Sequence, residues 1–167
     1  MLKRIVGIVT NPDTRATVYI LQVFPIVLIP PIIIMSTAFY FTPIIFDLDP
    51  NFKLETGPDV GLGLLDLLGI TLVSPIIETY LLVAVIHWVE RAISSNKIKT
   101  AIYSALFFSI LHSILVPMWG VFVFWGFFIY SLALISRNNH GHRDGIYITI
   151  TLHSLNNTFV WILIAIQ

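Results

Sequence analysis

Five long apolar stretches limit what this chain can fold into. A helix needs about 20 apolar residues to cross the hydrocarbon core of a bilayer, so 167 residues leave room for about five spans and little else. Only 11% of the residues are charged, and the mean hydropathy is +0.90. Lipid offers backbone groups no hydrogen-bond partners, so spanning segments of this kind are helices. We therefore expect an all-α integral membrane protein: a bundle of about five transmembrane helices that makes up a single membrane domain over residues 1–167.

The expected spans are separated by loops rich in charged residues, Gly or Pro. They cover residues 16–46, 60–89, 100–116, 119–135 and 145–167. The first span contains the pair Pro30-Pro31, so we expect a single helix that is broken or kinked there, with a re-entrant pair of half-spans as the alternative. Residues 1–9 hold too short an apolar run for a span and are expected to form a retained interfacial segment.

The basic residues predict the orientation of the chain. Only Lys53 lies in a loop on one side of the expected spans, and the other eight of the nine basic residues lie on the opposite side. These eight are Lys3, Arg4, Arg15, Arg91, Lys97, Lys99, Arg137 and Arg143. Because short cytoplasmic loops carry an excess of Lys and Arg, we expect the N-terminus inside and the C-terminus outside. The formal net charge of zero argues against a nucleic-acid partner.

One carboxylate, Glu78, lies in the middle of the second apolar stretch, three residues after Pro75. A charge at the bilayer centre costs about 3 kcal/mol by insertion scales, and it is usually kept where it faces a bundle interior or a wet cavity. Pro75 frees a carbonyl about one turn earlier, near Thr71, and bends the helix just before Glu78. This bend is expected to open a small polar cavity.

Three further polar residues lie at the depth of Glu78. Counted from the nearest basic residue at the cytoplasmic end of each span, the offsets are 13 for Glu78, 13 for His112, 10 for His153 and 14 for Asn157. Helical rise places all four about 15–21 Å inside those ends. His153 and Asn157 are spaced i, i+4, so they share one face of their helix. A carboxylate, two imidazoles and a carboxamide from three helices therefore indicate a site.

This set of side chains is sufficient for amide hydrolysis. A carboxylate beside an imidazole can polarise a water molecule and pass its proton to a leaving amine. His153 and Asn157 can donate hydrogen bonds to an oxyanion as a carbonyl becomes tetrahedral. The sequence has no cysteine, no His-Glu-x-x-His motif and no membrane-depth lysine that pairs with a serine. Zinc held by Glu78, His112 and His153 is geometrically possible, because this ligand set is known in catalytic sites.

The remaining polar and aromatic residues have plainer interpretations. Asp66 is expected to be a solvated residue at the start of its helix, His87 to be interfacial, and His140 and His142 to lie in a polar loop. The aromatic residues of the fourth span are expected mostly to pack or to face lipid, although some could line a substrate groove. They include Trp119, Phe122, Phe124, Trp125, Phe127 and Phe128.

The same residues also match a known pattern. The sequence resembles the CPBP family of intramembrane proteases, also called the Abi or CAAX-protease family. Glu78 takes the place of the first Glu in the family motif Glu-Glu-x-x-x-Arg. Phe108 and His112 match Phe-x-x-x-His, and His153 and Asn157 match His-x-x-x-Asn. Each motif is short, but their order, spacing and common depth make the combination specific.

The resemblance implies a glutamate-type intramembrane endopeptidase in a prokaryotic cytoplasmic (inner) membrane, with a protease core over residues 75–157. It implies that Glu78 and His112 activate water and that His153 and Asn157 stabilise the oxyanion. It argues against zinc, so we expect no metal and no cofactor. The implied partners are the lipid bilayer, a membrane-associated peptide or protein substrate and, as an option, a membrane partner subunit.

Two positions depart from the first motif of the family. Thr79 replaces the second Glu, and Val83 replaces the Arg. They leave open a second hypothesis, in which the chain is a non-catalytic family member that acts as a membrane immunity or scaffold protein. The polar residues would then form an interhelical hydrogen-bond network. A transporter fits less well, because the polar residues form one layer and not a path across the bilayer.

Overall fold

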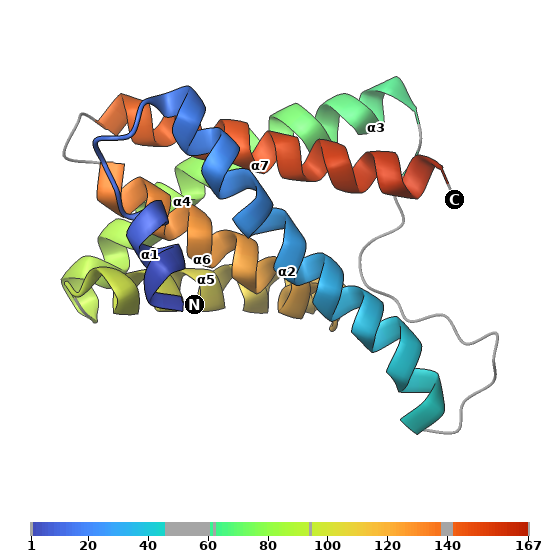
Figure 1. The fold of residues 1–167 in the computed structure, drawn as a ribbon. Coiled ribbons are helices and arrows are strands. Elements are labelled where there is room, and N and C mark those ends of the chain that lie inside the picture. Colours follow the sequence, from blue (N-terminus) through green and yellow to red (C-terminus); the bar gives the residue numbers. More distant parts are fainter. Residues whose placement is uncertain (1, 46–60, 62, 94, 138–141, 167) are drawn as a thin grey trace.

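All regular structure in the described part of the chain is helical (Figure 1). The computed structural model describes residues 2–45, 61, 63–93, 95–137 and 142–166. The elements are α1 (Leu2–Val9), α2 (Ala16–Ile45), α3 (Leu64–Leu68), the π-helical segment η1 (Gly69–Val73), α4 (Ser74–Ala92), α5 (Lys97–Leu115), α6 (Trp119–Arg137) and α7 (His142–Ala165). The all-helical prediction is confirmed for these residues.

Five helical segments are long and apolar enough to cross a membrane. They are Ala16–Ala38, Leu64–Ala92, Lys97–Leu115, Trp119–Arg137 and Asp144–Ala165. The predicted number of spans is therefore confirmed by length and composition. The acidic loop that was expected between the first two spans lies outside the described residues, as does His140.

The first span is one uninterrupted helix, which confirms the preferred single-helix prediction, whereas a break at the double proline and the re-entrant alternative are both wrong. Pro30 has no N–H to offer the carbonyl of Ile26, four residues earlier. The indole Nε1 of Trp125, on α6, donates to that carbonyl oxygen at 2.7 Å. A side chain from a neighbouring helix thus replaces the missing backbone donor, and the helix continues through the prolines.

Three helix starts differ from the sequence prediction. The second span, expected from residue 60, has its first helical residue at Leu64. The third span begins at Lys97, three residues early, because the Asn96 side chain accepts hydrogen bonds from the backbone N–H groups of Ile98 and Lys99, each at 3.1 Å. The fifth begins at His142, so this residue opens α7 and does not lie in the preceding loop as predicted.

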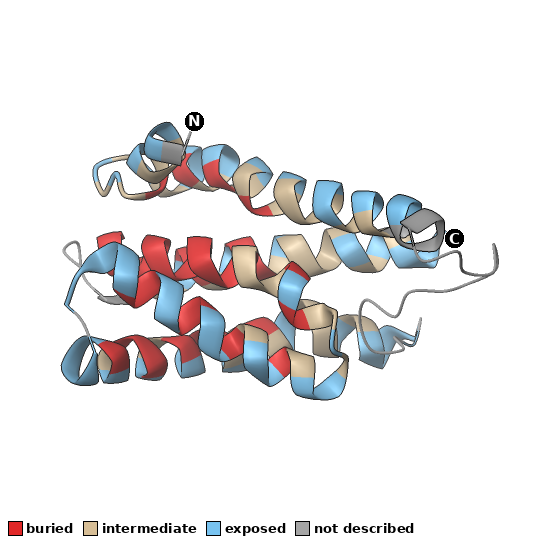
Figure 2. Cartoon of the chain, turned by 90° about the horizontal axis from the view of Figure 1, so that it is seen from below, coloured by how far each residue is buried: buried red, intermediate tan, exposed pale blue. Residues whose placement is uncertain are grey.

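Helix α6 lies at the centre of the bundle and contacts α1, α2, α4, α5 and α7. Figure 2 shows buried residues gathered where the helices face one another. The α5–α6 hairpin is held by the hydroxyl of Ser109, which donates to the Gly120 carbonyl at 2.7 Å, and by that of Ser113, which donates to the Pro117 carbonyl at 3.0 Å. A Cβ atom at Gly120 would overlap Ser113 Oγ and the Ser109 carbonyl, so the close approach requires glycine.

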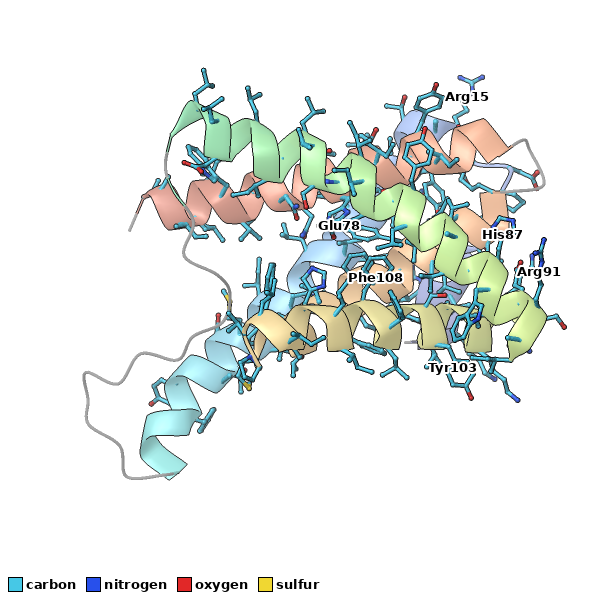
Figure 3. The ribbon with its side chains drawn as sticks, turned by 180° about the vertical axis from the view of Figure 1, so that it is seen from behind. Arg15, Glu78, His87, Arg91, Tyr103 and Phe108 are labelled. Atoms are coloured by element: carbon cyan, nitrogen blue, oxygen red, sulfur yellow. The ribbon has the colours of Figure 1, made fainter. Side chains whose placement is uncertain are left out.

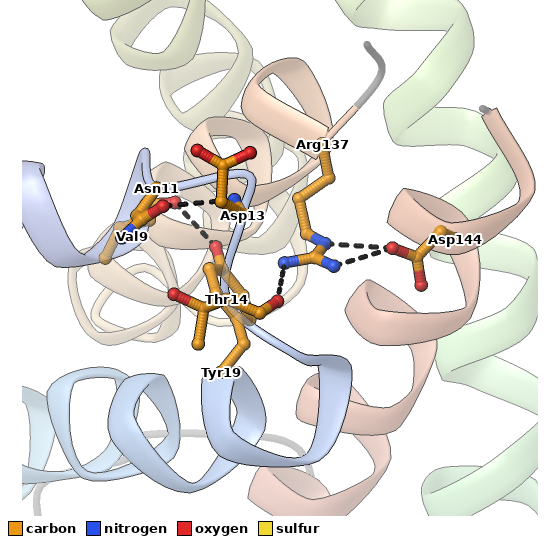
Figure 4. A network of polar contacts seen from close by, with 7 residues as sticks. All are labelled: Val9, Asn11, Asp13, Thr14, Tyr19, Arg137 and Asp144. Atoms are coloured by element: carbon orange, nitrogen blue, oxygen red, sulfur yellow. Dashed lines mark hydrogen bonds and ion pairs between the residues drawn. The ribbon is translucent and has the colours of Figure 1, made fainter. Parts of the chain in front are cut away.

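A buried arginine joins the N-terminal segment to the last two helices (Figure 4). Arg137 is 4% exposed, and it donates to Asp144 Oδ2 at 2.7 Å and to the Thr14 carbonyl at 2.9 Å. Its guanidinium lies 4.8 Å from the centre of the Tyr19 ring, whose hydroxyl donates to the Val9 carbonyl at 2.6 Å. The residues before the first span are therefore fastened to the bundle through α1 and the turn that follows it.

Several basic residues lie at the same end of the bundle. Figure 3 shows Arg15 and Arg91 at this end, together with His87. The bond between Arg137 and Thr14 places Arg137 there as well. We call this the basic end, and distances along the helices are described from it below.

Candidate active site

The helix that carries Glu78 is set by the π-helical segment before it. In η1 the N–H of Ser74 donates to the carbonyl of Gly69, five residues earlier. The next donor in this i to i+5 ladder would be residue 75, a proline, so the carbonyl of Ile70 receives nothing from it. The Nδ2 of Asn157, on α7, donates to that carbonyl oxygen at 3.0 Å. The carbonyl of Ile70, next to Thr71, is thus freed in the region where the sequence predicted a freed carbonyl.

The two carboxylate oxygens of Glu78 have different neighbours. Ser74, one helical turn earlier, donates a short hydrogen bond from its hydroxyl to Oε1. The other oxygen, Oε2, lies 3.8 Å from Nε2 of His112 and 3.8 Å from Nε2 of His153. The side chain is 22% exposed, whereas the two histidine side chains are buried. Three helices, α4, α5 and α7, therefore bring three ionisable groups to one point.

The ring of His112 is held in a defined orientation. Its Nδ1 lies 2.7 Å from the carbonyl oxygen of Phe108, one turn earlier on α5. A carbonyl can only accept a hydrogen bond, so Nδ1 carries a proton. In the neutral ring, Nε2 then has a free lone pair on the side that faces Glu78. The four-residue spacing of Phe108 and His112 produces this arrangement directly.

Aromatic rings surround the histidines. The Phe127 ring stacks on Phe108 at 4.1 Å between centroids and lies 5.5 Å from the His112 ring and 5.6 Å from the His153 ring. Trp119 meets His112 edge-on at 4.5 Å. Trp119 and Phe127 thus border the site, and both belong to the aromatic set for which the sequence indicated packing or lipid contact, with lining of a substrate groove as an option. Rings that exclude water strengthen the electrostatic interactions inside.

Two residues at the site were not found from the sequence. Ser74 could have been found, because its i, i+4 spacing to Glu78 puts both on one helix face. Tyr130, on α6, has no such signal. Its ring stacks on His153 with the centroids 4.9 Å apart and an interplanar angle of 29°.

One of the two hydrogens on Asn157 Nδ2 is already used within the fold, and the predicted oxyanion role of Asn157 stays a prediction. Its described hydrogen bond goes to the backbone of η1, and it lies one turn of α7 beyond His153. The structure therefore brings together Glu78, His112 and His153, while Asn157 fastens the helix that carries Glu78. Of the two positions that depart from the motif, Thr79 is buried and Val83 is partly buried.

Comparison of the chain with protein-family models, curated proteins and solved structures finds no match.

The described residues contain no group of three His, Cys, Asp or Glu side chains arranged to hold a metal ion. In the cluster of Glu78, His112 and His153, Glu78 Oε2 lies 3.8 Å from each histidine Nε2, which is longer than a direct hydrogen bond and matches the separation of two groups that share one hydrogen-bonding molecule. A water molecule needs two to four polar partners, and this cluster offers them.

His87 and Asp66, which were also considered from the sequence, lie outside the site. His87 Nδ1 lies 2.8 Å from the Val83 carbonyl oxygen, and the residue borders a cavity of about 50 Å³ between α4, α6 and α7, nearer the basic end. Asp66 is exposed in the first turn of α3 and accepts a hydrogen bond from the Gly63 N–H at 3.3 Å. It stabilises the start of its helix, as the sequence predicted.

Proposed function

We propose that this protein is an intramembrane endopeptidase that hydrolyses a membrane-associated peptide or protein. The observation that carries the proposal is the position of Glu78 Oε2, which lies 3.8 Å from both His112 Nε2 and His153 Nε2 within the bundle. Glu78 Oε2 and the lone pair of His112 Nε2 are both acceptors, and at this separation one water molecule can donate a hydrogen to each of them. The resemblance of the sequence motifs to the CPBP family of intramembrane proteases supports the same assignment.

In the proposed reaction, a water molecule donates its hydrogens to Glu78 Oε2 and to the lone pair of His112 Nε2. A lone pair of the water oxygen attacks the scissile carbonyl carbon as one water proton passes to Glu78. The new C–O bond forms, and the carbonyl π electrons move onto the oxygen as an oxyanion, to which His153 donates a hydrogen bond. When the carbonyl re-forms, the C–N bond breaks and the leaving nitrogen takes the proton held by Glu78.

The proposed setting is a cytoplasmic membrane of a prokaryote, with the N-terminus inside and the site within the bilayer. The substrate reaches the site laterally between helices or from the basic end. The apolar composition of the five spans and the gathering of arginines at one end support this orientation. The family resemblance supports catalysis without a metal or a cofactor.

The decisive experiment measures cleavage of fluorescein-labelled casein, and of quenched peptides with apolar segments, by the full chain in lipid nanodiscs. Glu78→Gln should lower kcat by at least about 100-fold, because it removes the carboxylate that accepts the water proton. Glu90→Gln makes the same chemical change at an exposed position on the same helix, and it should leave the rate unchanged. Full activity in Glu78→Gln would remove the central claim.

A second candidate function is a non-catalytic immunity or scaffold protein. The structural observation in its favour is that Asn157 bonds to the backbone of η1 while Thr79 and Val83 stand where the family has Glu and Arg. Under this hypothesis, Glu78→Gln lowers the stability of the bundle or its partner binding, and the wild-type protein hydrolyses none of the peptides. Measuring cleavage and thermal unfolding on the same samples separates the two functions.

A further inference from the structure

Tyr130 carries a polar group that the fold does not use. The residue is 2% exposed, and among the described residues its hydroxyl has no hydrogen-bond partner. A phenylalanine would fill nearly the same volume without burying an unpaired hydroxyl, which is a costly arrangement. Such a hydroxyl in a protein interior calls for a partner that the fold itself does not supply.

The hydroxyl lies beside the candidate active site. The Tyr130 ring stacks on His153 at 4.9 Å and meets Phe127 edge-on at 5.8 Å. Helix α6 thus contributes a polar group to a centre whose other ionisable groups come from α4, α5 and α7.

The direction of the side chain places the hydroxyl at a definite level. A Cβ atom built on Gly126 would lie 3.8 Å from Tyr130 Oη, so the side chain runs toward the N-terminal end of α6. Helices α6 and α7 are antiparallel, because Leu134 lies against Gly145 while Tyr130 lies against His153. Going from Tyr130 toward Gly126 is therefore the same direction as going from His153 toward Asn157.

Asn157, the second oxyanion donor predicted from the sequence, lies at this level. Asn157 was expected to share that role with His153, but its amide donates to the Ile70 carbonyl. The Asn157 amide thus uses one of its two hydrogens on the backbone, and a buried hydroxyl without a partner among the described residues lies at a similar height on the neighbouring helix.

We propose that the Tyr130 hydroxyl contacts the substrate and donates a hydrogen bond, together with His153, to the oxyanion formed at the scissile carbonyl. The inference rests on the proposed endopeptidase function. Tyr130 transfers no proton: its O–H bond stays intact while negative charge builds up on the substrate oxygen and is withdrawn again as the C–N bond breaks. Preorganised donors of this kind act mainly on the transition state, so they affect kcat more than KM.

The test compares Tyr130→Phe with the wild type in nanodiscs, using labelled casein and the quenched apolar peptides. We expect kcat to fall on the order of 100-fold, as for the loss of one oxyanion donor, and KM to change less than about twofold. The unfolding temperature should not fall, because the hydroxyl has no protein partner. Tyr103→Phe removes the same atom from an exposed tyrosine on α5 and should change none of these values.

The outcomes separate the inference from the function on which it rests. A wild-type protein that is folded but hydrolyses none of the substrates overturns both. An active wild type with inactive Glu78→Gln and fully active Tyr130→Phe overturns only the role of Tyr130. A Tyr130→Phe variant that unfolds at a lower temperature while keeping its kcat also contradicts the inference, because the hydroxyl would then serve the fold.

Discussion

At the scale of single residues, the Ser74 hydroxyl defines which oxygen of Glu78 faces the histidines. It occupies Oε1 and leaves Oε2 toward His112 and His153. The family motif has a Glu and an Arg after its first Glu, and this chain has Thr79 and Val83 instead. A serine one turn before the glutamate is a different way to hold the carboxylate, and it uses a local i, i+4 contact.

Ser74→Ala should lower kcat about 10-fold, because a hydrogen bond to a charged group fixes the carboxylate rotamer and is worth about 1.5–3 kcal/mol. Ser74→Thr keeps the hydroxyl and should restore most of the rate, which a purely structural role would not predict. Cleavage rates in nanodiscs check this, with Ser95→Ala, at an exposed position, as the control. Equal rates for the alanine variant and the wild type would show that Glu78 needs no positioning from Ser74.

At the scale of helices, two prolines are accommodated in the same way. Pro30 leaves the Ile26 carbonyl without its backbone donor, and Trp125 from α6 bonds to it. Pro75 leaves the Ile70 carbonyl free, and Asn157 from α7 bonds to it. In both cases a remote N–H group satisfies a carbonyl that lipid could not satisfy. These bonds also fix the neighbouring helices against each other at the level of the site.

The bond between Asn157 and η1 can be tested by a double-mutant cycle. Asn157→Leu should destabilise the bundle by about 0.6–1.7 kcal/mol, the range of interhelical hydrogen bonds in membranes. In a Pro75→Ala background the new backbone N–H can serve the Ile70 carbonyl, so the same substitution should cost less. Reversible unfolding in mixed micelles measures both costs, and Asn156→Leu controls for the neighbouring position. If the stability costs of Asn157→Leu and Pro75→Ala simply add, the backbone N–H at position 75 does not replace the Asn157 amide at the Ile70 carbonyl, and the interpretation is contradicted.

At the scale of the whole molecule, the two ends of the helix bundle differ, because arginines gather at one of them, the basic end. Arg15 and Arg91 lie at the basic end, and the buried Arg137 closes it by joining Thr14 and Asp144. Arginine side chains at that end are attracted to a membrane surface rich in anionic lipid, which is the cytoplasmic surface. This supports the predicted orientation, with the basic end on the cytoplasmic side. The N-terminus inside stays a prediction that labelling can check.

The chain contains no cysteine, so single cysteines report on topology without background labelling. Ser95→Cys, between α4 and α5, should react with a membrane-impermeant maleimide only after the cells are permeabilised, because it lies at the basic end. Asp59→Cys, in the acidic loop of the sequence, should react in intact cells. The unmodified chain is the control, and the reverse labelling pattern would contradict the predicted orientation.

Much of this architecture follows from local sequence. A membrane helix satisfies its backbone by bonds within itself, so hydropathy alone locates the five spans. Regular helical rise also allowed Glu78, His112 and His153 to be placed at one depth before their contacts were known. The error at the start of the third span came from capping, because the Asn96 side chain adds three residues to the helix.

The tertiary structure alone decided which remote groups meet. Asn157 and Ile70 are 87 residues apart, and Trp125 and Ile26 are 99 residues apart. A carbonyl freed by proline can accept a hydrogen bond from any N–H group that packing brings near it. Which N–H group comes near depends on how the helices rotate and cross, and local sequence patterns do not encode this. For the same reason the sequence indicated a carboxylate and two histidines, whereas the use of Asn157 by the backbone and the position of Tyr130 beside His153 emerged only from the assembled bundle.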